Sequence, residues 1–374
     1  MESEADLTAV TPKHDLAVIV PTYKEVDNIP VLIGEIAKVM AQTKLSYEII
    51  IVDDDSRDGT SECVSGLADR YPVRLVTRTN ERGLSSAVIR GFDEADAEIL
   101  LCMDADLSHP PSAIPQMVRK LRAGADFVLG SRYVPGGQTE GDWGLFRWLN
   151  SKVATLLALP FTRAADPMSG FFALCRTAFL EAKNTLSPIG YKIGLELIVK
   201  CGYVQVVEVP ITFANRQRGQ SKLSLTEQLN YIKHLKRLAD FKYKALSHFF
   251  QFSVIGASGA VVDLASYTLL MSYIPLTVAR GMAIVVAMLW NFLLNRQINY
   301  SEHARDGKVF TQLGRFVIAC AAGAGINWAV SIQSMRFIDA LSDHALIAAV
   351  FGIVAGTATN FLLTHTWVFR HHKQ

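Results

Sequence analysis

Hydrophobic and polar residues alternate along the first half of the chain in a pattern that predicts strands and helices in turn. Short apolar runs typical of buried strands cover residues 16–22, 48–52, 73–77, 98–103 and 127–130. Segments with helical spacing lie between them, at residues 29–41, after residue 60, at 84–92 and at 112–122. This alternation predicts an α/β domain over residues 15–224, with a mostly parallel sheet and helices on both faces.

The second half, residues 249–370, is dominated by apolar residues. Two pairs of segments in it repeat: QFSVIGASGAVVDL resembles RFVIACAAGAGINW, and NFLLNRQINY resembles NFLLTHTWVF. The repeat predicts two copies of a two-helix hairpin, each entering and leaving the membrane on one side. Four stretches in this half are long enough to cross a bilayer, at residues 249–274, 276–294, 316–338 and 345–364.

Polar residues also occur within or near these four stretches. Their side chains either hold the helices together or line a path for lipid, and the sequence leaves both readings open. They are Asp263, Asn291, Asn295, Asn327 and Asn360.

Basic residues mark one side of the apolar stretches. The opposite loops, residues 274–277 and 339–344, contain no Lys or Arg. The positive-inside rule therefore predicts a multi-pass membrane protein with both termini and the first half in the cytoplasm. Residues 1–14 are acidic and lack the apolar core of a secretory signal, so we expect a flexible N-terminus. The basic residues are Lys233, Lys236, Arg237, Lys242, Lys244, Arg296, Arg305, Lys308, Arg370 and Lys373.

Residues 225–248 join the two halves and have a helical pattern. Apolar side chains recur at three-residue steps within a strongly basic background, from Leu229 to Phe241. We expect a helix lying on an anionic membrane surface. A plain solvated connector is the alternative.

Composition supports a membrane-bound part and excludes several other classes. Half of the residues are hydrophobic, and the mean hydropathy of +0.22 is high for a soluble protein. The five cysteines show no CxxC or other ligand spacing, which favours buried reduced thiols over a disulfide framework or a zinc site. The net charge of +2 says little about partners.

Two carboxylates, Asp104 and Asp106, directly follow the apolar run that ends at Met103. On an extended chain alternate side chains share a face, so these like charges need something positive between them. Ligands of open parallel sheets bind beyond the carboxyl ends of the strands, where the polar segments PTYKE and DDDS also fall. A divalent cation that bridges to the phosphates of a nucleotide diphosphate would supply the positive charge between the carboxylates and would place a ligand at the strand ends. Neither GxxxxGK[ST] nor GxGxxG follows the first strand, so no P-loop or dinucleotide fold is indicated.

Eight motifs in order carry a family resemblance: VIVPTYKEVDNIP, IIIVDDDSRDGT, RGLSSAVIRG, MDADLSHPP, GSRYVPGG, DPMSGFFAL, GYKIGLELIVK and FANRQRGQSKLS. They resemble the dolichol-phosphate and polyprenyl-phosphate mannose synthases, which are inverting family 2 glycosyltransferases with an A-type, Rossmann-like fold. The second half resembles the four-helix GtrA-like membrane domain found beside or fused to such enzymes.

This resemblance assigns roles to residues at the strand ends. It implies nucleotide binding by Pro21, Tyr23, Glu25, Asp53, Asp54 and Gly83. It implies that Asp104 and Asp106 hold Mg²⁺ or Mn²⁺ against the donor diphosphate. Ser108, which stands where some members have Gln, is a third candidate ligand.

The acceptor chemistry calls for cationic side chains. A lipid phosphate is already anionic near neutral pH and needs no general base, but the two repelling phosphates must be held in line. Arg132, Arg147 and Ser151 are candidates, the last two sharing a face of an expected helix, and the resemblance assigns the matching residues to the lipid phosphate. Arg216 and Lys222 resemble a mobile lid over the donor phosphates.

The roles of two further acidic residues stay open at this stage. Asp166 and Glu196 are either structural or directed at the sugar. Asp104, Asp106, Arg132 and Arg147 are the residues we expect to carry catalysis.

We therefore expect transfer of one hexose to a polyprenyl phosphate on the cytoplasmic face, with inversion. GDP-mannose is the preferred donor, because DLSHPP, DPMSG and the lid segment resemble the mannose synthases, and UDP-glucose is the alternative. A lipid-linked sugar flippase or carrier without catalysis is a rival of another class. The QxxRW motif of processive synthases is absent, which disfavours chain extension. No feature indicates nucleic acid as a partner.

Overall fold

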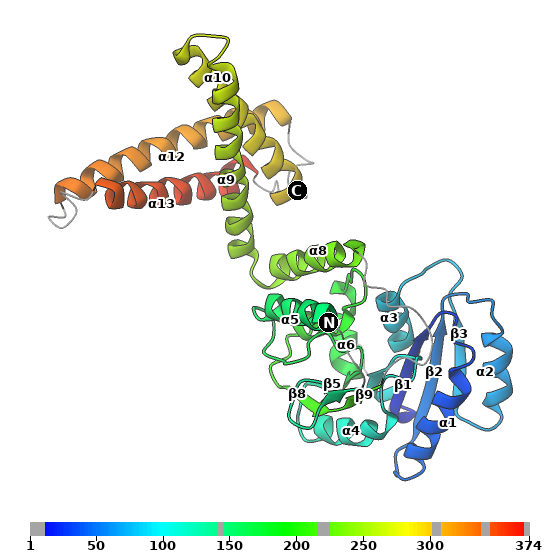
Figure 1. Cartoon of the computed structure of the whole chain (residues 1–374). Helices are drawn as coiled ribbons and strands as arrows, with labels where there is room; N and C mark the ends of the chain where they lie inside the picture. Colours follow the sequence, from blue (N-terminus) through cyan, green and yellow to red (C-terminus); the bar gives the residue numbers. More distant parts are fainter. Residues whose placement is uncertain (1–11, 141–144, 215–224, 301–307, 338–344, 370–374) are drawn as a thin grey trace, which may run out of the picture. The chain divides into compact units, whose positions relative to one another are not determined.

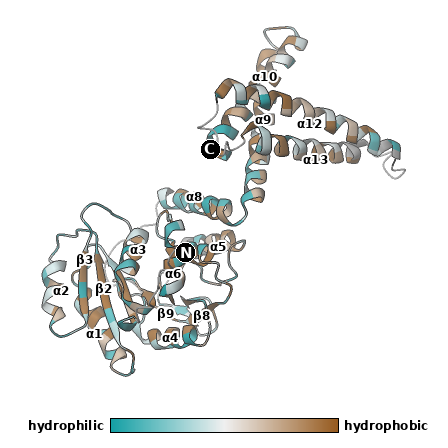
Figure 2. Ribbon diagram, turned by 180° about the vertical axis from the view of Figure 1, so that it is seen from behind, coloured by the Kyte–Doolittle hydropathy of each residue, from teal (hydrophilic) through white to brown (hydrophobic). Residues whose placement is uncertain are grey.

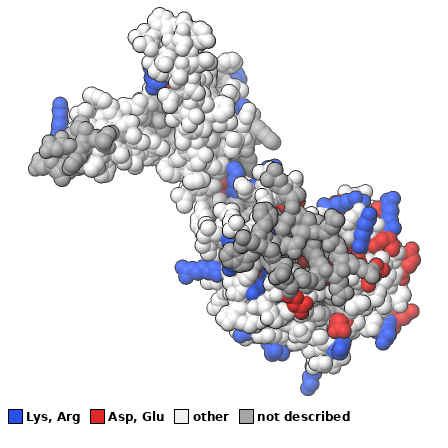
Figure 3. Space-filling model, in the orientation of Figure 1, with Lys and Arg blue, Asp and Glu red and all other residues white. Residues whose placement is uncertain are grey.

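The computed structural model describes residues 12–140, 145–214, 225–300, 308–337 and 345–369 (Figure 1). The chain divides into two compact units, Met1–Lys242 and Tyr243–Gln374. On the face drawn in Figure 3, charged side chains crowd the surface of the first unit, whereas the second unit is almost uncharged. The two units therefore suit different surroundings, and each is described by itself.

A seven-stranded sheet in the order β3-β2-β1-β4-β7-β5-β8 forms the centre of the first unit. All neighbouring strands are parallel except β7, which is antiparallel to both β4 and β5. The predicted mostly parallel sheet is thus confirmed, although β7 and β8 were not predicted. The strands are β1 (His14–Thr22), β2 (Tyr47–Asp53), β3 (Val73–Thr77), β4 (Ala97–Cys102), β5 (Phe127–Ser131), β7 (Phe172–Cys175) and β8 (Val206–Pro210), and β6 (Gln138–Thr139) pairs separately with β9 (Thr212–Phe213).

Helices cover both faces of this sheet, so the strands are apolar along their whole length. In β1, Leu16, Val18 and Val20 pack into the core on one face, while Ala17 and Ile19 pack into the core on the other. Figure 2 shows these strands as hydrophobic between amphipathic helices. The first face carries α1 (Ile29–Met40), α2 (Thr60–Ala68) and α4 (Ile114–Arg122), and the second carries α3 (Leu84–Glu94), α6 (Arg176–Ala182) and α7 (Ile193–Lys200).

Two further helices, α5 (Leu145–Ala158) and α8 (Leu225–Lys242), complete the first unit. Ala158 at the end of α5 and Leu238 of α8 pack with Leu195 and Val199 of α7 in a small separate core. The hydroxyl of Tyr231 on α8 donates to the carbonyl of Ala154 on α5 (2.7 Å). This packing places α8, expected to lie at the membrane surface, beside the helix that carries Arg147 and Ser151.

The second unit consists of α9 (Lys244–Leu270), α10 (Leu276–Leu294), α12 (Val309–Phe337) and α13 (Ala345–Leu363). Within the described residues, three helices are long and apolar enough to cross a membrane: Lys244–Leu270, Leu276–Asn299 and Val309–Ser334. The fourth predicted stretch coincides with α13, which is 19 residues long. The expected connector of residues 225–248 is divided at Tyr243, which leaves helical geometry between α8 and α9.

The internal repeat recurs as matching contacts in the two hairpins, which pack α9 on α10 and α12 on α13. A Cβ on Gly259 would meet the side chain of Asn291, and a Cβ on Gly323 would meet that of Asn360 in the same way. Each hairpin ends in a π-helical turn, Asn295–Asn299 or Thr364–Val368. The duplication read from the sequence is therefore also visible in the packing.

The remaining polar residues of these helices also make contacts within the unit. Asp263 accepts a hydrogen bond from Arg280 (2.7 Å), which joins α9 to α10. Asn295 donates to the carbonyl of Asn291 (2.9 Å), and the carbonyl of Asn327 accepts from Ser331 (2.8 Å). The Asn295 and Ser331 bonds lie within their own helices. The Arg280 bond joins two helices, and a Cβ on Gly352 of α13 would meet Asn327 of α12, so Asp263 and Asn327 make contacts of helix packing, the first of the two roles that the sequence left open.

Candidate active site

The carboxyl ends of β2, β1 and β4 lie side by side and bring the predicted site residues to one edge of the sheet. The strand register pairs Thr22 with Asp53 and Ile19 with Cys102. Tyr23 and Asp54 follow these strand ends directly and Asp104 follows two residues after the end of β4, so residues far apart in the sequence become neighbours. This is the edge at which open sheets of parallel strands bind ligands.

Tyr23 has an exposed ring at the part of this edge formed by the ends of β1 and β2. Its side chain is 38% exposed, and the charged ends of Lys24 and Arg82 each lie 5.4 Å from its ring centroid. The Lys24 N–H donates to Ser56 Oγ (2.8 Å) in a left-handed turn, and Ser56 in turn donates to the Asp53 carboxylate. An aromatic ring flanked by two cations is suited to a base and phosphates.

Asp54 is held by two groups that come from beyond β3. Arg78 forms a buried ion pair with its carboxylate (3.0 Å), and the Gly83 N–H donates to Asp54 Oδ2 (2.8 Å). Gly83 has a φ of 134°, which L side chains rarely adopt, and this explains a glycine at the start of α3. Gly83 therefore fixes the predicted nucleotide-binding Asp54. The side chain of Glu25 accepts from Asn28 (2.6 Å) at the start of α1.

Asp104 and Asp106 occupy the loop after β4 in different environments. The Asp104 side chain is 26% exposed, while Asp106 is buried and accepts from the hydroxyl (2.5 Å) and the N–H (3.1 Å) of Ser108. Ser108 is thus directed at Asp106, and its predicted contact with a metal stays a prediction. His109 fixes the other end of the loop, because its Nδ1 accepts from the Asp104 N–H (3.0 Å).

The surroundings of Asp104 fit a divalent cation. A Cβ on Gly170 would lie 3.3 Å from both Asp104 carboxylate oxygens, so the glycine keeps the space around them free. No group of three or more His, Cys, Asp or Glu side chains suited to a metal occurs within the described residues. Mg²⁺ needs no such group, because it keeps waters and uses one or two carboxylates together with substrate phosphates.

Arg132 is held rigidly beside this loop by Asp166. Its side chain donates from Nε and Nη2 to the two Asp166 oxygens, both at 2.7 Å, and its N–H donates to Oδ2. Glu208 fixes Asp166 by accepting from its N–H (2.9 Å). Burial lowers the pKa of Arg132, but hydrogen bonding to Asp166 and the Asp166 charge outweigh burial and raise it overall. The cation is therefore permanent and fixed.

Phe213 joins the cationic and the acidic sides of the site. The Arg132 guanidinium lies 5.1 Å from the Phe213 ring centroid, and the His109 ring packs edge-on against Phe213 at 5.5 Å. Since His109 also holds Asp104, one wall carries both Arg132 and the carboxylate loop. Asp104, expected to act on the donor diphosphate, and Arg132, expected to act on the acceptor phosphate, are thus brought together.

Ser151 reaches the same region from α5. Its hydroxyl lies 2.8 Å from that of Tyr133, the residue after Arg132. Arg147 belongs to α5, but its side chain lies outside the described part of the chain, as do Arg216 and Lys222 of the expected lid. The roles of these three residues stay predictions.

Lys192, before α7, is a residue of this region that sequence reasoning missed. Burial lowers the pKa of its ammonium most strongly, the Arg132 charge lowers it further, and the carboxylates of Asp166 and Asp104 oppose both effects. The lysine belongs to the segment GYKIGLELIVK, but no spacing linked it to β4 or β5. A link could have been found only from the fold, which brings α7 against Phe172 of β7.

The structure separates the two acidic residues whose roles were open. Asp166 contacts Arg132 at the site, whereas Glu196 lies buried on α7 and pairs with Lys200 (2.7 Å). Asp166 therefore forms part of the wall of the site, and Glu196 has a structural role in the core around α7.

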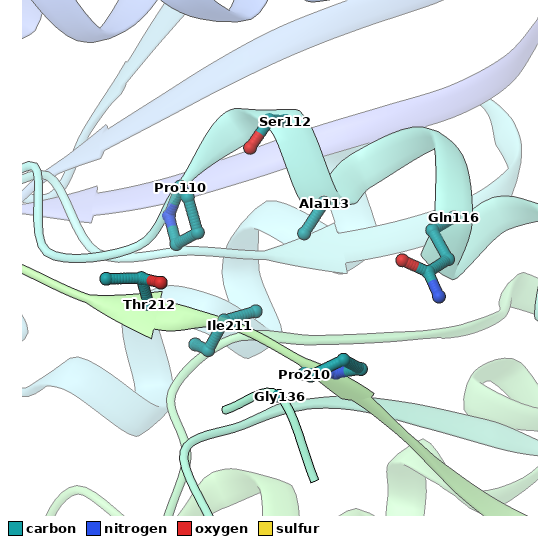
Figure 4. A pocket seen from close by; sticks show the side chains of 8 residues that line it. All are labelled: Pro110, Ser112, Ala113, Gln116, Gly136, Pro210, Ile211 and Thr212. Atoms are coloured by element: carbon teal, nitrogen blue, oxygen red, sulfur yellow. The ribbon is translucent and has the colours of Figure 1, made fainter. Parts of the chain in front are cut away.

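A separate cavity of about 240 Å³ lies between the start of α4 and the segment that joins β8 to β9 (Figure 4). No charged side chain lines it and none of the predicted site residues contributes, so it does not suit a diphosphate. Its lining consists of Pro110, Ser112, Ala113, Gln116, Gly136, Pro210, Ile211 and Thr212.

Two family models match the chain, one in each half. Residues 17–182 match the model of glycosyl transferase family 2, and residues 251–369 match the GtrA/DPMS transmembrane domain. A mannosyl-3-phosphoglycerate synthase structure from Rubrobacter xylanophilus is 17% identical, covers 62% of this chain and 75% of that one, and superposes with a TM-score of 0.48.

Two curated relatives carry the same name. The dolichol-phosphate mannosyltransferase of Mycosarcoma maydis is 44% identical over 63% of this chain and 82% of its own length. The dolichol-phosphate mannosyltransferase of Pyrococcus furiosus is 40% identical over 94% of this chain and 99% of its own length. The chain therefore belongs to the dolichol-phosphate mannosyltransferase family and is a membrane-bound glycosyltransferase of family 2.

Proposed function

We propose that the chain transfers mannose from GDP-mannose to a polyprenyl or dolichyl phosphate, with inversion at the anomeric carbon. The observation that carries the proposal is the shared wall of Asp104, His109, Phe213 and Arg132. It sets a carboxylate pair suited to a metal diphosphate beside a fixed cation suited to a second phosphate. The names of the relatives support mannose and dolichyl phosphate as the transferred group and the acceptor.

The residues of the site supply binding and orientation. The acceptor phosphate is anionic near neutral pH and attacks without a general base, so the wall must overcome repulsion between two phosphates. Arg132, locked by Asp166, offers its charge without reorganising when the substrates arrive. Mg²⁺ or Mn²⁺, when bound by Asp104 and Asp106, supplies charge neutralisation for the nucleotide diphosphate that leaves.

A lipid acceptor is supported by the exposed apolar side chains of two neighbouring helices. On α5 they include Leu149, Val153 and Leu156, and on α8 they include Leu229 and Ile232. Such side chains beside basic residues are typical of helices that lie in a membrane interface. We infer that α5 and α8 dock on the membrane and present the lipid phosphate to Arg132.

The cytoplasmic placement of both termini belongs to the same proposal. It is supported by the basic residues at one end of the apolar helices. A single cysteine engineered at Ala5 or Lys373, in a chain whose own cysteines are replaced, should react with an impermeant maleimide only after cells are opened. Labelling of intact cells would reverse the orientation.

The test of the reaction uses purified full-length protein in detergent with polyprenyl phosphate and Mg²⁺ or Mn²⁺. Radiolabelled GDP-mannose and UDP-glucose are offered separately, and an Asp106→Ala variant serves as the control. We expect label in the lipid phase from GDP-mannose alone, lost in the variant. Label from UDP-glucose alone would overturn the donor, and label from neither would favour a carrier without catalysis.

A further inference from the structure

The loop of residues 187–192, which leads into α7 and carries Lys192, is fixed by side chains from three helices. The Ser187 N–H donates to Glu196 of α7 (2.6 Å), and the Ile189 N–H donates to Nδ1 of His234 on α8 (3.4 Å). The carbonyl of Gly190 accepts from Ser85 of α3 (2.6 Å). Three such anchors on six residues leave the loop little freedom.

The anchor on α8 is part of a buried polar group. His234 is 1% exposed, and its Nε2 lies 3.6 Å from Glu196 Oε2. Glu196, itself 2% exposed, also pairs with Lys200, whose ammonium donates to the carbonyl of Thr185 (2.6 Å). Buried polar groups are costly unless they are paired, so this network holds α8, α7 and the loop in one arrangement.

The far end of the loop reaches the candidate active site. A Cβ on Gly194 would lie 3.5 Å from the carbonyl of Ser169, next to Gly170, which faces the Asp104 carboxylate. Lys192, two residues before Gly194, lies within electrostatic reach of Arg132, Asp166 and Asp104. The position of its ammonium in the site therefore depends on how the loop is held.

We propose that His234 is a positioning residue, which fixes the loop of residues 187–192 from α8 and thereby places Lys192 against the substrate phosphates. The link makes the geometry of the site depend on α8, the helix inferred to dock on the membrane. The effect on catalysis rests on the function proposed above, whereas the link itself is a property of the fold. His234 touches neither substrate nor metal in this account, because it acts through the Ile189 N–H.

Two substitutions at His234 separate its hydrogen bond from its bulk. In His234→Asn the side-chain oxygen takes the place of Nδ1 and can still accept from Ile189, whereas His234→Leu cannot. Ser85→Ala removes a different anchor from the opposite side with little change in volume. Lys233→Ala, at an exposed position of α8 for which the described residues show no hydrogen bond or ion pair with the loop, is the matched control.

Hydrogen exchange of the full-length protein in detergent reads the loop directly. Loss of one hydrogen bond should make the amides of residues 187–192 exchange about tenfold faster in His234→Leu and in Ser85→Ala. We expect no change in His234→Asn, in Lys233→Ala or in the strands of the sheet. Unchanged exchange of the loop in a folded His234→Leu variant would overturn the link, and the Ser85 variant decides if His234→Leu does not fold.

Kinetics with Lys192→Met tests the consequence. We expect His234→Leu to lower kcat about tenfold, with the KM for GDP-mannose within twofold of the wild type. His234→Asn should keep kcat near the wild-type value. The double variant His234→Leu, Lys192→Met should be no slower than Lys192→Met alone, because both changes remove the same contribution. Multiplied losses would show that His234 does not act through Lys192. A wild-type protein without transfer would reject the proposed function, while hydrogen exchange would still decide the link.

Discussion

Buried and partly buried polar residues serve different purposes in the two units. In the first unit, Asp54, Asp166 and Arg132 lie beyond or behind strand ends and are held by other charged groups. In the second unit, Asn291 and Asn360 lie within helices and press against Gly259 and Gly323. Charge at a strand end can meet a substrate, whereas an amide against a glycine brings two helices close. Residue type alone does not reveal function, and position in the fold does.

The largest effect is expected at Asp166, where the charged arrangement of the first unit is most completely buried. Asp166→Asn leaves the Arg132 guanidinium without its carboxylate in a buried place. Loss of one partner of a buried ion pair destabilises a protein by about 3–5 kcal/mol. Thermal unfolding should show this loss. The exposed pair of Lys183 and Asp93 provides the control, since Lys183→Ala should cost less than about 1 kcal/mol.

An Asp166→Asn variant that unfolds like the wild type would show that water reaches Arg132 freely. The contrast between a fixed, dry cation and an ordinary surface arginine would then be lost. In that case preorganisation could not explain how Arg132 acts on a phosphate.

Much of this arrangement could be predicted from the sequence, and the limits have physical causes. The apolar run of β1 and the spacing of the helices around it gave the sheet, because local pattern controls local structure. Asp104 and Asp106 were found because a carboxylate pair after a buried strand is unusual. The predicted Arg132 also lies at this edge of the sheet.

The missing parts depend on contacts between distant residues. The sequence did not show β7, a short antiparallel strand whose neighbours come from elsewhere in the chain. Nor did it pair Arg132 with Asp166, 34 residues away, or bring Lys192 towards Asp104. In the membrane half, by contrast, the repeat predicted from sequence contains both members of each Gly and Asn contact. A duplicated sequence carries its packing with it.

The next largest effect is expected at Asp104, on activity alone. Asp104→Asn keeps the shape of the side chain but removes one of two charges available to a divalent cation. We expect transfer to fall by about 10²–10³-fold, the usual cost of removing one electrostatic contribution from an active site. Label transfer at saturating Mn²⁺ is the measurement. Unfolding should change little, because the Asp104 side chain is partly exposed and its contact with His109 (3.8 Å) involves an imidazole whose pKa is lowered by burial.

Full activity of Asp104→Asn would remove the metal from the explanation. If excess Mn²⁺ restored the activity of Asp104→Asn, the metal would stay in the explanation. The lost charge would then act through the affinity of the site for the ion. Removal of divalent ions by a chelator should abolish transfer in the wild type, and transfer that survives the chelator would also remove the metal from the explanation.

Gly323→Ala tests the second unit separately. Its Cβ would meet the Asn360 side chain at a distance shorter than real contacts allow, so Asn360 must move aside or α12 and α13 must separate. Overpacking of this kind costs about 1–3 kcal/mol. Thermal unfolding in detergent should report the loss, while kcat stays near that of the wild type. Gly325→Ala, where a Cβ meets no atom within 4 Å, is the matched control.

A large loss of kcat in Gly323→Ala, with the protein still folded, would contradict the division of labour between the two units. It would show that hairpin packing reaches the site, and the membrane helices would then take part in catalysis.

The smallest effect is expected at Asp58, before α2. Its carboxylate accepts from the hydroxyl (2.7 Å) and the N–H (3.2 Å) of Thr60 and from the Val26 N–H (3.4 Å). Burial raises the pKa of Asp58, but these hydrogen bonds outweigh burial and lower it overall. Because the folded pKa is the lower one, the stabilisation is complete above the unfolded pKa and disappears as the pH falls through the folded value.

Asp58→Ala should therefore lower stability by about 0.5–2 kcal/mol at pH 7, the size of one or two hydrogen bonds. The difference from the wild type should shrink below about pH 4, the unfolded pKa of an aspartate. Unfolding measured at several pH values gives both results. A difference that did not change with pH would mean that Asp58 acts by shape rather than by charge. The hydrogen bonds of Asp58 would then resemble the uncharged asparagine contacts of the membrane helices. The contrast between the two units would hold only at the edge of the sheet where the substrates are expected to bind.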